Sequence, residues 1–182
     1  KHIDSLKRSG YDIAAVKGKG YRLEHPEHAV IPAFIEKNLA DPHWGKPVFY
    51  TAQTESTNLW ARQLLETESL PEGTLVLASQ QTGGRGRLGR IWSSPPGGLY
   101  FSLVLRPPLD LQRASLLSLV MAAACARSLQ QYTGCSCGIK WPNDVMINER
   151  KAGGILLEAS GEIDRLDYVV AGIGINVNLL PQ

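Results

Sequence analysis

The sequence predicts an α+β fold, in which helices cover a mixed or antiparallel sheet. Short apolar segments of strand length follow one another in the second half of the chain. Two turn signals, Asn148-Glu149-Arg150 and Gly161-Glu162, join neighbouring segments as hairpins. The segment Leu111–Tyr132 has the length and the Ala/Leu-rich face of a long core helix, and it ends before Gly134.

The composition is that of an ordinary globular domain. Of the 182 residues, 43% are hydrophobic and 20% are charged, which argues against disordered, collagen-like and coiled-coil proteins. The longest apolar stretch, Leu116–Ala126, is interrupted by Ser118 and is too short to span a membrane. Three cysteines do not suggest a disulfide framework, and no secretory leader opens the chain. We therefore expect a cytoplasmic protein with no membrane partner.

Residues 1–25 are basic, with six Lys or Arg against three acidic residues, a net charge of +3. Lys1–Ser9 has the pattern of the end of a helix, and Tyr11–Leu23 that of a β-hairpin turning at Gly18-Lys19-Gly20. A basic helix followed by a basic hairpin is typical of the second half of a winged helix-turn-helix. We expect the chain to start inside a longer protein that binds DNA; the alternative is a solvated hairpin.

The remaining chain divides into residues 26–46, a linker and first helix, and residues 47–182, the main domain. The linker is His25-Pro26-Glu27-His28. The expected elements are, in order, a helix at Ile31–Leu39, a strand at Pro47–Tyr50, a helix at Thr57–Glu66 capped by Ser56, strands at Thr74–Ala78 and Leu99–Leu105, the helix Leu111–Tyr132, and short strands at Gly138–Trp141, Val145–Ile147, Gly154–Glu158 and Tyr168–Ile173. Since no element closes the end at Asn176–Gln182, we expect the C-terminal part of the parent protein to be missing.

The four histidines all lie in the first quarter of the chain. The rest therefore cannot supply a Ser-His-Asp triad, a His-ligated metal or a His general base. Between Gly73 and Leu109 there is no acidic residue, whereas four arginines fall there: Arg85, Arg87, Arg90 and Arg106. Such a stretch is suited to face an anion.

The segment Gln80–Arg90 is rich in glycine and arginine. Its spacing formally satisfies the dinucleotide motif G-x-G-x-x-G, but the following Trp92–Gly98 cannot open the helix that this motif requires, and no Walker A ending is present. What remains is a flexible loop whose backbone amides and guanidinium groups can bind a phosphate. The alternative is an exposed arginine turn or a nucleic-acid patch.

Three further segments carry polar or glycine patterns. Lys140-Trp141-Pro142-Asn143-Asp144 presents a cation beside an amide and a carboxylate, and is otherwise a polar turn. Lys151–Glu158 places a lysine before two glycines and an apolar strand, and is otherwise a plain hairpin strand. Gly172–Asn178 alternates glycine with β-branched residues, which leaves one sheet face bare for a flat ligand or for close packing of a helix.

Together with Ser56-Thr57-Asn58, these four segments closely resemble biotin protein ligases, with matches in order from about Thr54 to Asn178. The resemblance implies a class II synthetase-like catalytic domain. It implies that biotin and ATP, with Mg²⁺, give biotinyl-5′-AMP, and that biotin is then transferred to a lysine of the biotin carboxyl carrier domain of a carboxylase. Residues 1–25 resemble the recognition helix and wing of the bifunctional ligases that also repress the biotin operon.

The resemblance also implies roles for individual residues. The biotin contacts would be Ser56, Thr57, Gln81, Gly84, Arg85, Arg87, Lys151, Gly154 and Gly172. The ATP contacts would be Arg87, Trp92, Lys140, Asn143 and Asn176, with Asn176 also a candidate ligand of Mg²⁺. Lys151, Arg85 and Arg87 would be catalytic, because they neutralise negative charge at the reacting centre.

The sequence departs from the family in two respects, and two other functions remain as alternatives. The first helices of the DNA-binding domain and the small C-terminal β-barrel of the family are absent from the sequence. The rivals are a lipoate–protein ligase and a ligand-sensing DNA-binding regulator without ligase activity. The resemblance implies operator DNA as a partner of the intact protein, and a possible homodimer formed through sheet edges.

Overall fold

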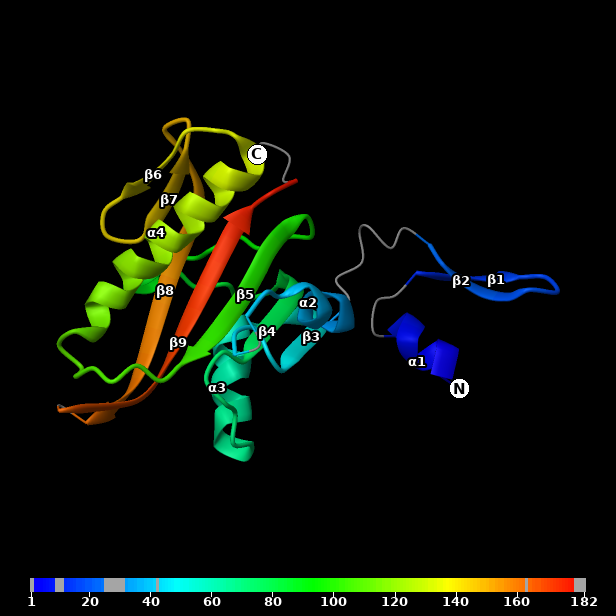
Figure 1. Cartoon of the computed structure of the whole chain (residues 1–182), viewed down its shortest axis with the longest axis horizontal. Coiled ribbons are helices and arrows are strands. Elements are labelled where there is room, and N and C mark those ends of the chain that lie inside the picture. Colours follow the sequence, from blue (N-terminus) through cyan, green and yellow to red (C-terminus); the bar gives the residue numbers. More distant parts are fainter. Residues whose placement is uncertain (1, 9–11, 25–31, 42, 163, 179–182) are drawn as a thin grey trace.

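The computed structural model describes residues 2–8, 12–24, 32–41, 43–162 and 164–178. At the N-terminus, helix α1 (His2–Arg8) precedes strands β1 (Ile13–Val16) and β2 (Gly20–Leu23), which pair antiparallel as a separate two-stranded sheet (Figure 1). The helix and hairpin expected in residues 1–25 are thus confirmed. The expected linker His25–His28 lies outside the described residues.

The main sheet has seven strands in the order β3-β4-β5-β9-β8-β7-β6 (Figure 1). β3 and β4 are parallel and every other neighbouring pair is antiparallel, so the predicted mixed sheet is confirmed. The strands are β3 (Val48–Thr54), β4 (Leu75–Gln81), β5 (Gly98–Leu105), β6 (Cys137–Lys140), β7 (Asp144–Ile147), β8 (Arg150–Glu162) and β9 (Arg165–Asn176). The helices are α2 (Pro32–Asn38), α3 (Thr57–Thr67) and α4 (Ala114–Thr133), with a 3-10 turn at Arg87–Gly89.

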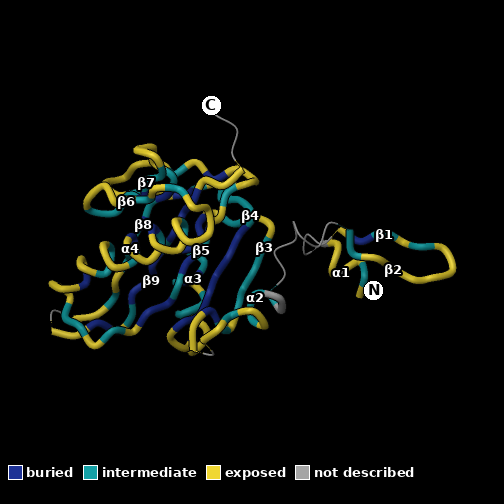
Figure 2. Tube along the Cα trace, turned by 45° about the horizontal axis from the view of Figure 1, so that its top comes forward, coloured by how far each residue is buried: buried dark blue, intermediate teal, exposed yellow. Residues whose placement is uncertain are grey.

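Helices α3 and α4 cover opposite faces of this sheet. Side chains along a strand alternate between the two faces. On β9, Val169 and Ile173 therefore pack with the buried alanines of α4, whereas Val170 packs with Ala61 of α3. Figure 2 shows the buried backbone concentrated in the central strands. The same alternation puts Gly172 and Gly174 on the α3 face, where the sheet carries no side chains at these positions.

Strands β8 and β9 are longer than the sequence predicts, with 13 and 12 residues. Ser160, Gly161 and Glu162 extend β8, and on β9 the buried Leu166 stands between Arg165 and Asp167, so no unbroken apolar pattern marks these ends. The hairpin expected at Gly161-Glu162 is confirmed, but its turn comes after Glu162, because both residues still belong to β8 and Glu162 pairs with Arg165. Gly161, at φ +151°, follows a shift of register. The turn expected at Asn148-Glu149 is confirmed, since both residues have the positive φ of a two-residue hairpin turn.

Helix α4 begins at Ala114, three residues later than predicted, because Asp110 accepts a hydrogen bond from the Arg113 backbone N–H (2.8 Å) and holds a turn before the helix. It ends as predicted at Gly134, whose φ of +69° is the left-handed conformation favoured by glycine. Within the part of the chain that the structure describes, no helix combines the length and apolar character needed to cross a bilayer.

Candidate active site

A cleft of about 350 Å³ lies on the α3 side of the sheet. It is bounded by the start of α3, by the arginine loop (residues 82–93), by the β6–β7 connection, and by the glycines of β8 and β9. Eleven predicted site residues line it: Ser56, Thr57, Gln81, Arg85, Arg87, Trp92, Lys140, Asn143, Lys151, Gly154 and Gly172. Segments separated by more than 100 residues are therefore brought together as the motifs predict.

Two predicted site residues, Gly84 and Asn176, do not line the cleft. Gly84 is a buried residue within the arginine loop, where a side chain would meet the Trp92 carbonyl and the Ser94 hydroxyl. Asn176 is exposed at the end of β9, opposite Gly98. The structure thus gives Gly84 a packing role, and it gives no support to Asn176 as a ligand of ATP or magnesium.

The side chain of Gln81, at the end of β4, is fixed at both of its ends. Its carboxamide oxygen accepts the backbone N–H of Thr57 (2.8 Å), and its Nε2 donates to Ser94 Oγ (2.8 Å), which in turn donates to the Trp92 carbonyl (3.0 Å). A strand side chain therefore caps the N-terminus of α3. Ser56 occupies the predicted N-cap position, but its hydroxyl makes no capping hydrogen bond.

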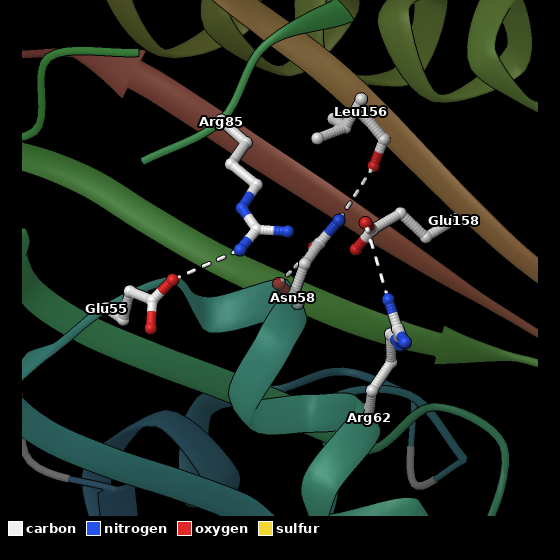
Figure 3. A network of polar contacts seen from close by, with 7 residues as sticks. Glu55, Asn58, Arg62, Arg85, Leu156 and Glu158 are labelled. Carbon is white, nitrogen blue, oxygen red and sulfur yellow. Dashed lines mark hydrogen bonds and ion pairs between the residues drawn. The ribbon is translucent and has the colours of Figure 1, made fainter. Parts of the chain in front are cut away.

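Asn58 is a buried cleft residue that sequence reasoning left without a role. Its Nδ2 donates to the Leu156 carbonyl on β8 (3.3 Å), and its Oδ1 accepts from Ser102 Oγ on β5 (2.6 Å). Figure 3 shows this amide reaching from α3 towards Leu156, between the ion pairs Glu55–Arg85 and Arg62–Glu158. The spacing to Ala61 could have identified Asn58. Residues three positions apart lie on the same face of a helix, so Asn58 shares the buried face of Ala61, where a polar side chain needs a partner.

The glycines of β8 and β9 form the floor of the cleft, and side chains from other elements lie directly over them. A Cβ on Gly172 would lie 2.3 Å from Asn58 Oδ1, and one on Gly174 would lie 2.4 Å from Trp92 Nε1. The indole of Trp92 also covers Gly154, with 3.2 Å to the position of its Cβ. These glycines therefore make room for Asn58 and Trp92 directly, and their predicted role towards biotin stays a prediction.

Trp92 Nε1 is a buried donor with no hydrogen-bond partner among the described residues. A buried polar group without a partner costs about 1–3 kcal/mol. The same indole lies 5.3 Å from Lys151 Nζ, within the range of a cation–π contact. The position of Trp92 over the glycines is thus held by packing and leaves its N–H available to an acceptor.

The cationic side chains of the cleft have partners that an anion can replace. Lys151 Nζ lies 2.7 Å from Asp144 Oδ1, and Arg85 Nη2 lies 3.1 Å from Glu55 Oε1. Arg87 Nη1 donates to Asn143 Oδ1 (3.3 Å) across the cleft. Arg85, Glu55 and Lys151 are about half exposed, and exposed ion pairs contribute little stability. Exchange of these partners for a carboxylate or phosphate therefore costs little.

The arginine loop is a small irregular hairpin. Bridges pair Gln81 with Ser94 and Arg85 with Ile91, and the Gly86 N–H donates to the Arg90 carbonyl (2.7 Å). Two large apolar side chains of the loop, Leu88 and Ile91, are 91% and 88% exposed although they belong to the cleft wall. A loop with so little burial can rearrange when a ligand fills the cleft.

Among the described residues, no group of three or more His, Cys, Asp or Glu side chains could hold a metal ion. Magnesium bound together with a nucleotide needs only one or two protein carboxylates, because phosphates and water supply its other ligands. Asp144 is a carboxylate on the cleft wall, and it already pairs with Lys151. The described site therefore fits a magnesium ion carried by nucleotide phosphates and not a cage built by the protein.

The chain matches the biotin/lipoate A/B protein ligase family over residues 50–176. It is 42% identical to the bifunctional ligase/repressor BirA of Bacillus subtilis, over 100% of this chain and 56% of that protein. Among solved structures, the biotin protein ligase of Leishmania major in complex with biotinyl-5-AMP has a TM-score of 0.65 and 30% identity, covering 75% of this chain and 60% of that one.

The biotin protein ligase of Aquifex aeolicus in complex with biotin and ATP has a TM-score of 0.62 and 37% identity. The alignment covers 75% of this chain and 56% of that one. The chain thus spans little more than half the length of these relatives.

Proposed function

The chain belongs to the biotin/lipoate A/B protein ligase family, and from that premise we propose that its protein is a biotin–[acetyl-CoA-carboxylase] ligase. It activates biotin with ATP as biotinyl-5′-AMP and transfers biotin to a lysine of a biotin carboxyl carrier domain. The observation that carries this proposal is that one cleft is lined both by uncharged hydrogen-bonding groups and by cationic side chains. Because the reaction consumes ATP, we assign it to the cytoplasm.

The uncharged lining groups suit the ureido group of biotin, which is neutral and has two N–H donors and a carbonyl acceptor. Thr57, Asn58 and Gln81 offer hydroxyl and carboxamide groups there, and Ser56 lies beside them. A site built from such groups selects a ligand that can satisfy their hydrogen bonds. A lipoyl dithiolane ring has no such groups, and this favours biotin over lipoate.

The cationic lining groups suit the reacting carboxylate and phosphates. In the first step a carboxylate oxygen of biotin attacks the α-phosphorus of ATP, and pyrophosphate leaves with the electron pair of the broken P–O bond. In the second step the amine of the carrier lysine attacks the acyl carbon, loses a proton, and AMP leaves. Lys151, Arg85 and Arg87 hold and neutralise the anions in both steps, so that no enzyme nucleophile is needed.

Lys140 and Asn143 also line the cleft, and Asn143 accepts a hydrogen bond from Arg87; both would contact the ATP phosphates. Magnesium, bound to those phosphates, would neutralise part of their charge. Trp92 would move from the glycine floor and cover the adenylate, and its N–H would then gain an acceptor. The exposure of Leu88 and Ile91 supports a rearrangement of the arginine loop in the same event.

Mass spectrometry of the purified protein after incubation with biotin, ATP and Mg²⁺ tests this function. We expect bound biotinyl-5′-AMP and release of one pyrophosphate for each adenylate. Parallel incubations with lipoate, and with biotin but no ATP, are the controls. Lipoyl-AMP formed in preference would support the rival lipoate ligase, and biotin bound without any adenylate would support a ligand sensor that lacks ligase activity.

For the intact protein we also propose two macromolecular partners besides the carrier domain. The basic helix and hairpin of residues 1–25 support binding to operator DNA and repression of the biotin operon. The edge of β8 that faces away from β9 supports a homodimer. On this edge β7 pairs only with Arg150 to Gly154, and Asn143 bonds to Ile155. Within the described chain, the rest of β8 pairs with β9 alone. Such an edge can pair with a second copy.

A further inference from the structure

We propose that Ser102, which lies outside the cleft wall, is a positioning residue for recognition of the ureido group and acts through Thr57 and Asn58. This inference rests on the proposed function, because it assigns the uncharged lining groups of the cleft to the ureido group. Ser102 lies on β5 and is 0% exposed. A hydroxyl buried in a central strand needs hydrogen-bond partners, and both of its partners line the cleft.

The position of the hydroxyl proton of Ser102 follows from its neighbours. Ser102 Oγ lies 2.6 Å from Asn58 Oδ1 and 2.8 Å from Thr57 Oγ1. A hydroxyl has one proton, and a carboxamide oxygen can only accept, so Ser102 donates to Asn58. The Thr57 hydroxyl then has two acceptors within reach, Ser102 Oγ and Gln81 Oε1, the latter at 3.2 Å. Ser102 thus links the α3 residues to each other.

The orientation of the Asn58 amide is fixed from both sides. The Leu156 carbonyl can only accept, so the amide nitrogen faces β8 and the amide oxygen faces Ser102 on β5. Gly172 stands directly opposite Ser102 in the β5–β9 pairing and opposite Leu156 in the β8–β9 pairing. Its missing side chain leaves the space that the carboxamide occupies, since a Cβ there would lie 2.3 Å from Asn58 Oδ1.

This arrangement has a consequence for the ligand. The amide nitrogens of Asn58 and Gln81 each use one proton on the protein, towards Leu156 and Ser94, and each keeps a second proton. Two N–H donors on the wall of one cleft suit a carbonyl oxygen such as that of a cyclic urea. Loss of Ser102 would leave Asn58 Oδ1 buried without this donor, and the amide would lose its fixed orientation.

The test is the Ser102→Ala variant of the purified protein, assayed for formation of biotinyl-5′-AMP. We expect the KM for biotin to rise about tenfold, as for a lost hydrogen bond in a buried site, with kcat and the KM for ATP changed less than about twofold. Desthiobiotin keeps the ureido ring and lacks the thioether ring, and we expect the same loss for it. A loss confined to biotin would overturn the assignment to the ureido group.

The control is Ser79→Ala, which removes a partly buried hydroxyl of β4 that is bonded to Tyr50 at 2.8 Å and lies outside the cleft. We expect it to lower thermal stability without raising the KM for biotin. Gly172→Ala is a second route to the same effect, because its methyl group would displace Asn58 while Ser102 stays in place. If Ser102→Ala does not fold, an unchanged KM for biotin in Gly172→Ala contradicts the inference; because Gly172 itself lines the cleft, a raised KM supports it only when desthiobiotin shows the same loss.

The outcomes separate this inference from the proposed function. If the unaltered protein forms biotinyl-5′-AMP and both Ser102→Ala and Gly172→Ala keep its KM for biotin, Ser102 is a structural residue only and the inference is wrong. If the unaltered protein forms no biotinyl-5′-AMP, the proposed function itself has failed. Parallel falls of kcat and of thermal stability at constant KM would also contradict a positioning role.

Discussion

Lys151 is the residue whose chemistry is the most direct to test. Its ammonium group pairs with Asp144 on the cleft wall and lies near the face of Trp92. If it stabilises charge that develops at the α-phosphate, Lys151→Ala is expected to lower the rate of adenylate formation by about 100-fold or more. The measurement is pyrophosphate release under saturating biotin and ATP.

An exposed lysine on α2, Lys37, supplies the control, since Lys37→Ala removes the same charge far from the cleft-lining residues. Pyrophosphate release that is unchanged in Lys151→Ala would remove this lysine from the catalytic set. Release lowered equally by both variants would point to a general effect of charge instead.

At this scale the sequence predicts residue types well and contacts poorly. The motifs identify most of the residues that line the cleft, because glycine, arginine and lysine in these patterns have few structural uses. They do not reveal that Gln81 caps α3 or that Asn58 fills the space over Gly172. Both contacts join elements far apart in the chain, and their geometry depends on the sheet register, which no local pattern encodes.

At the scale of elements, the glycines of β9 can be tested against another strand glycine. A methyl group on Gly174 would meet the Trp92 ring, whereas one on Gly138 of β6 has nothing within 4 Å. Gly174→Ala is therefore expected to lower the free energy of unfolding by about 1–3 kcal/mol, the usual cost of overpacking. Gly138→Ala is expected to change it by less than about 0.5 kcal/mol.

Denaturant unfolding followed by circular dichroism measures both variants, and tryptophan fluorescence reports a displaced indole. Equal stability of the two variants would mean that Trp92 moves away from Gly174 without cost. In that case the indole is packed over Gly154 and Gly174 less tightly than its short distances to these glycines indicate.

The arginine loop is the element expected to retain the adenylate. Arg87 reaches across the cleft to Asn143 and so joins the loop to the β6–β7 connection. Arg87→Gly is expected to release biotinyl-5′-AMP at least tenfold faster, because a charge-assisted contact to the phosphate is lost. Released adenylate would then label lysines of bystander proteins.

Biotinylation of serum albumin, detected with streptavidin, measures this escape, with Arg165→Ala at the start of β9 as the control. Arg165 pairs with Asp167 and is not part of the cleft. Labelling that stays confined to the carrier domain in Arg87→Gly would show that this arginine does not retain the intermediate.

The order and type of the elements follow from the sequence, because apolar periodicity and turn residues are local signals. The ends of β8 and β9 do not, since polar residues interrupt the apolar pattern there and even the buried Leu166 stands between Arg165 and Asp167. The cap of α3 shows the same limit: Ser56 has the residue type and the position, but the hydrogen bond comes from Gln81 on a neighbouring strand.

At the scale of the whole molecule, the division into residues 1–25, 26–46 and 47–182 stays a prediction. The described residues contain a separate hairpin and a seven-stranded sheet, and the expected linker lies outside them. The cleft unites segments from both halves of the main domain, so its activity depends on the complete sheet. Binding to DNA, in contrast, would depend on the basic N-terminal segment.

This separation can be measured on the intact protein. Lys17 and Lys19 lie at the turn between β1 and β2 and are exposed, as contacts of a wing with phosphates require. Loss of two phosphate contacts is expected to reduce the slope of log K against log salt concentration by about 2. The double variant Lys17→Ala/Lys19→Ala should therefore bind operator DNA more weakly, most clearly at low salt, and form biotinyl-5′-AMP at the unaltered rate.

Fluorescence anisotropy of labelled DNA at several salt concentrations gives the slope, and the double variant Lys37→Ala/Arg165→Ala, outside the hairpin and the cleft, controls for the loss of two positive charges. A slope that stays constant would mean that the hairpin does not contact phosphates, and the DNA-binding surface would then lie elsewhere. A parallel loss of adenylate formation would contradict the separation of the two functions, because it would couple the hairpin to a cleft that the described residues build without it.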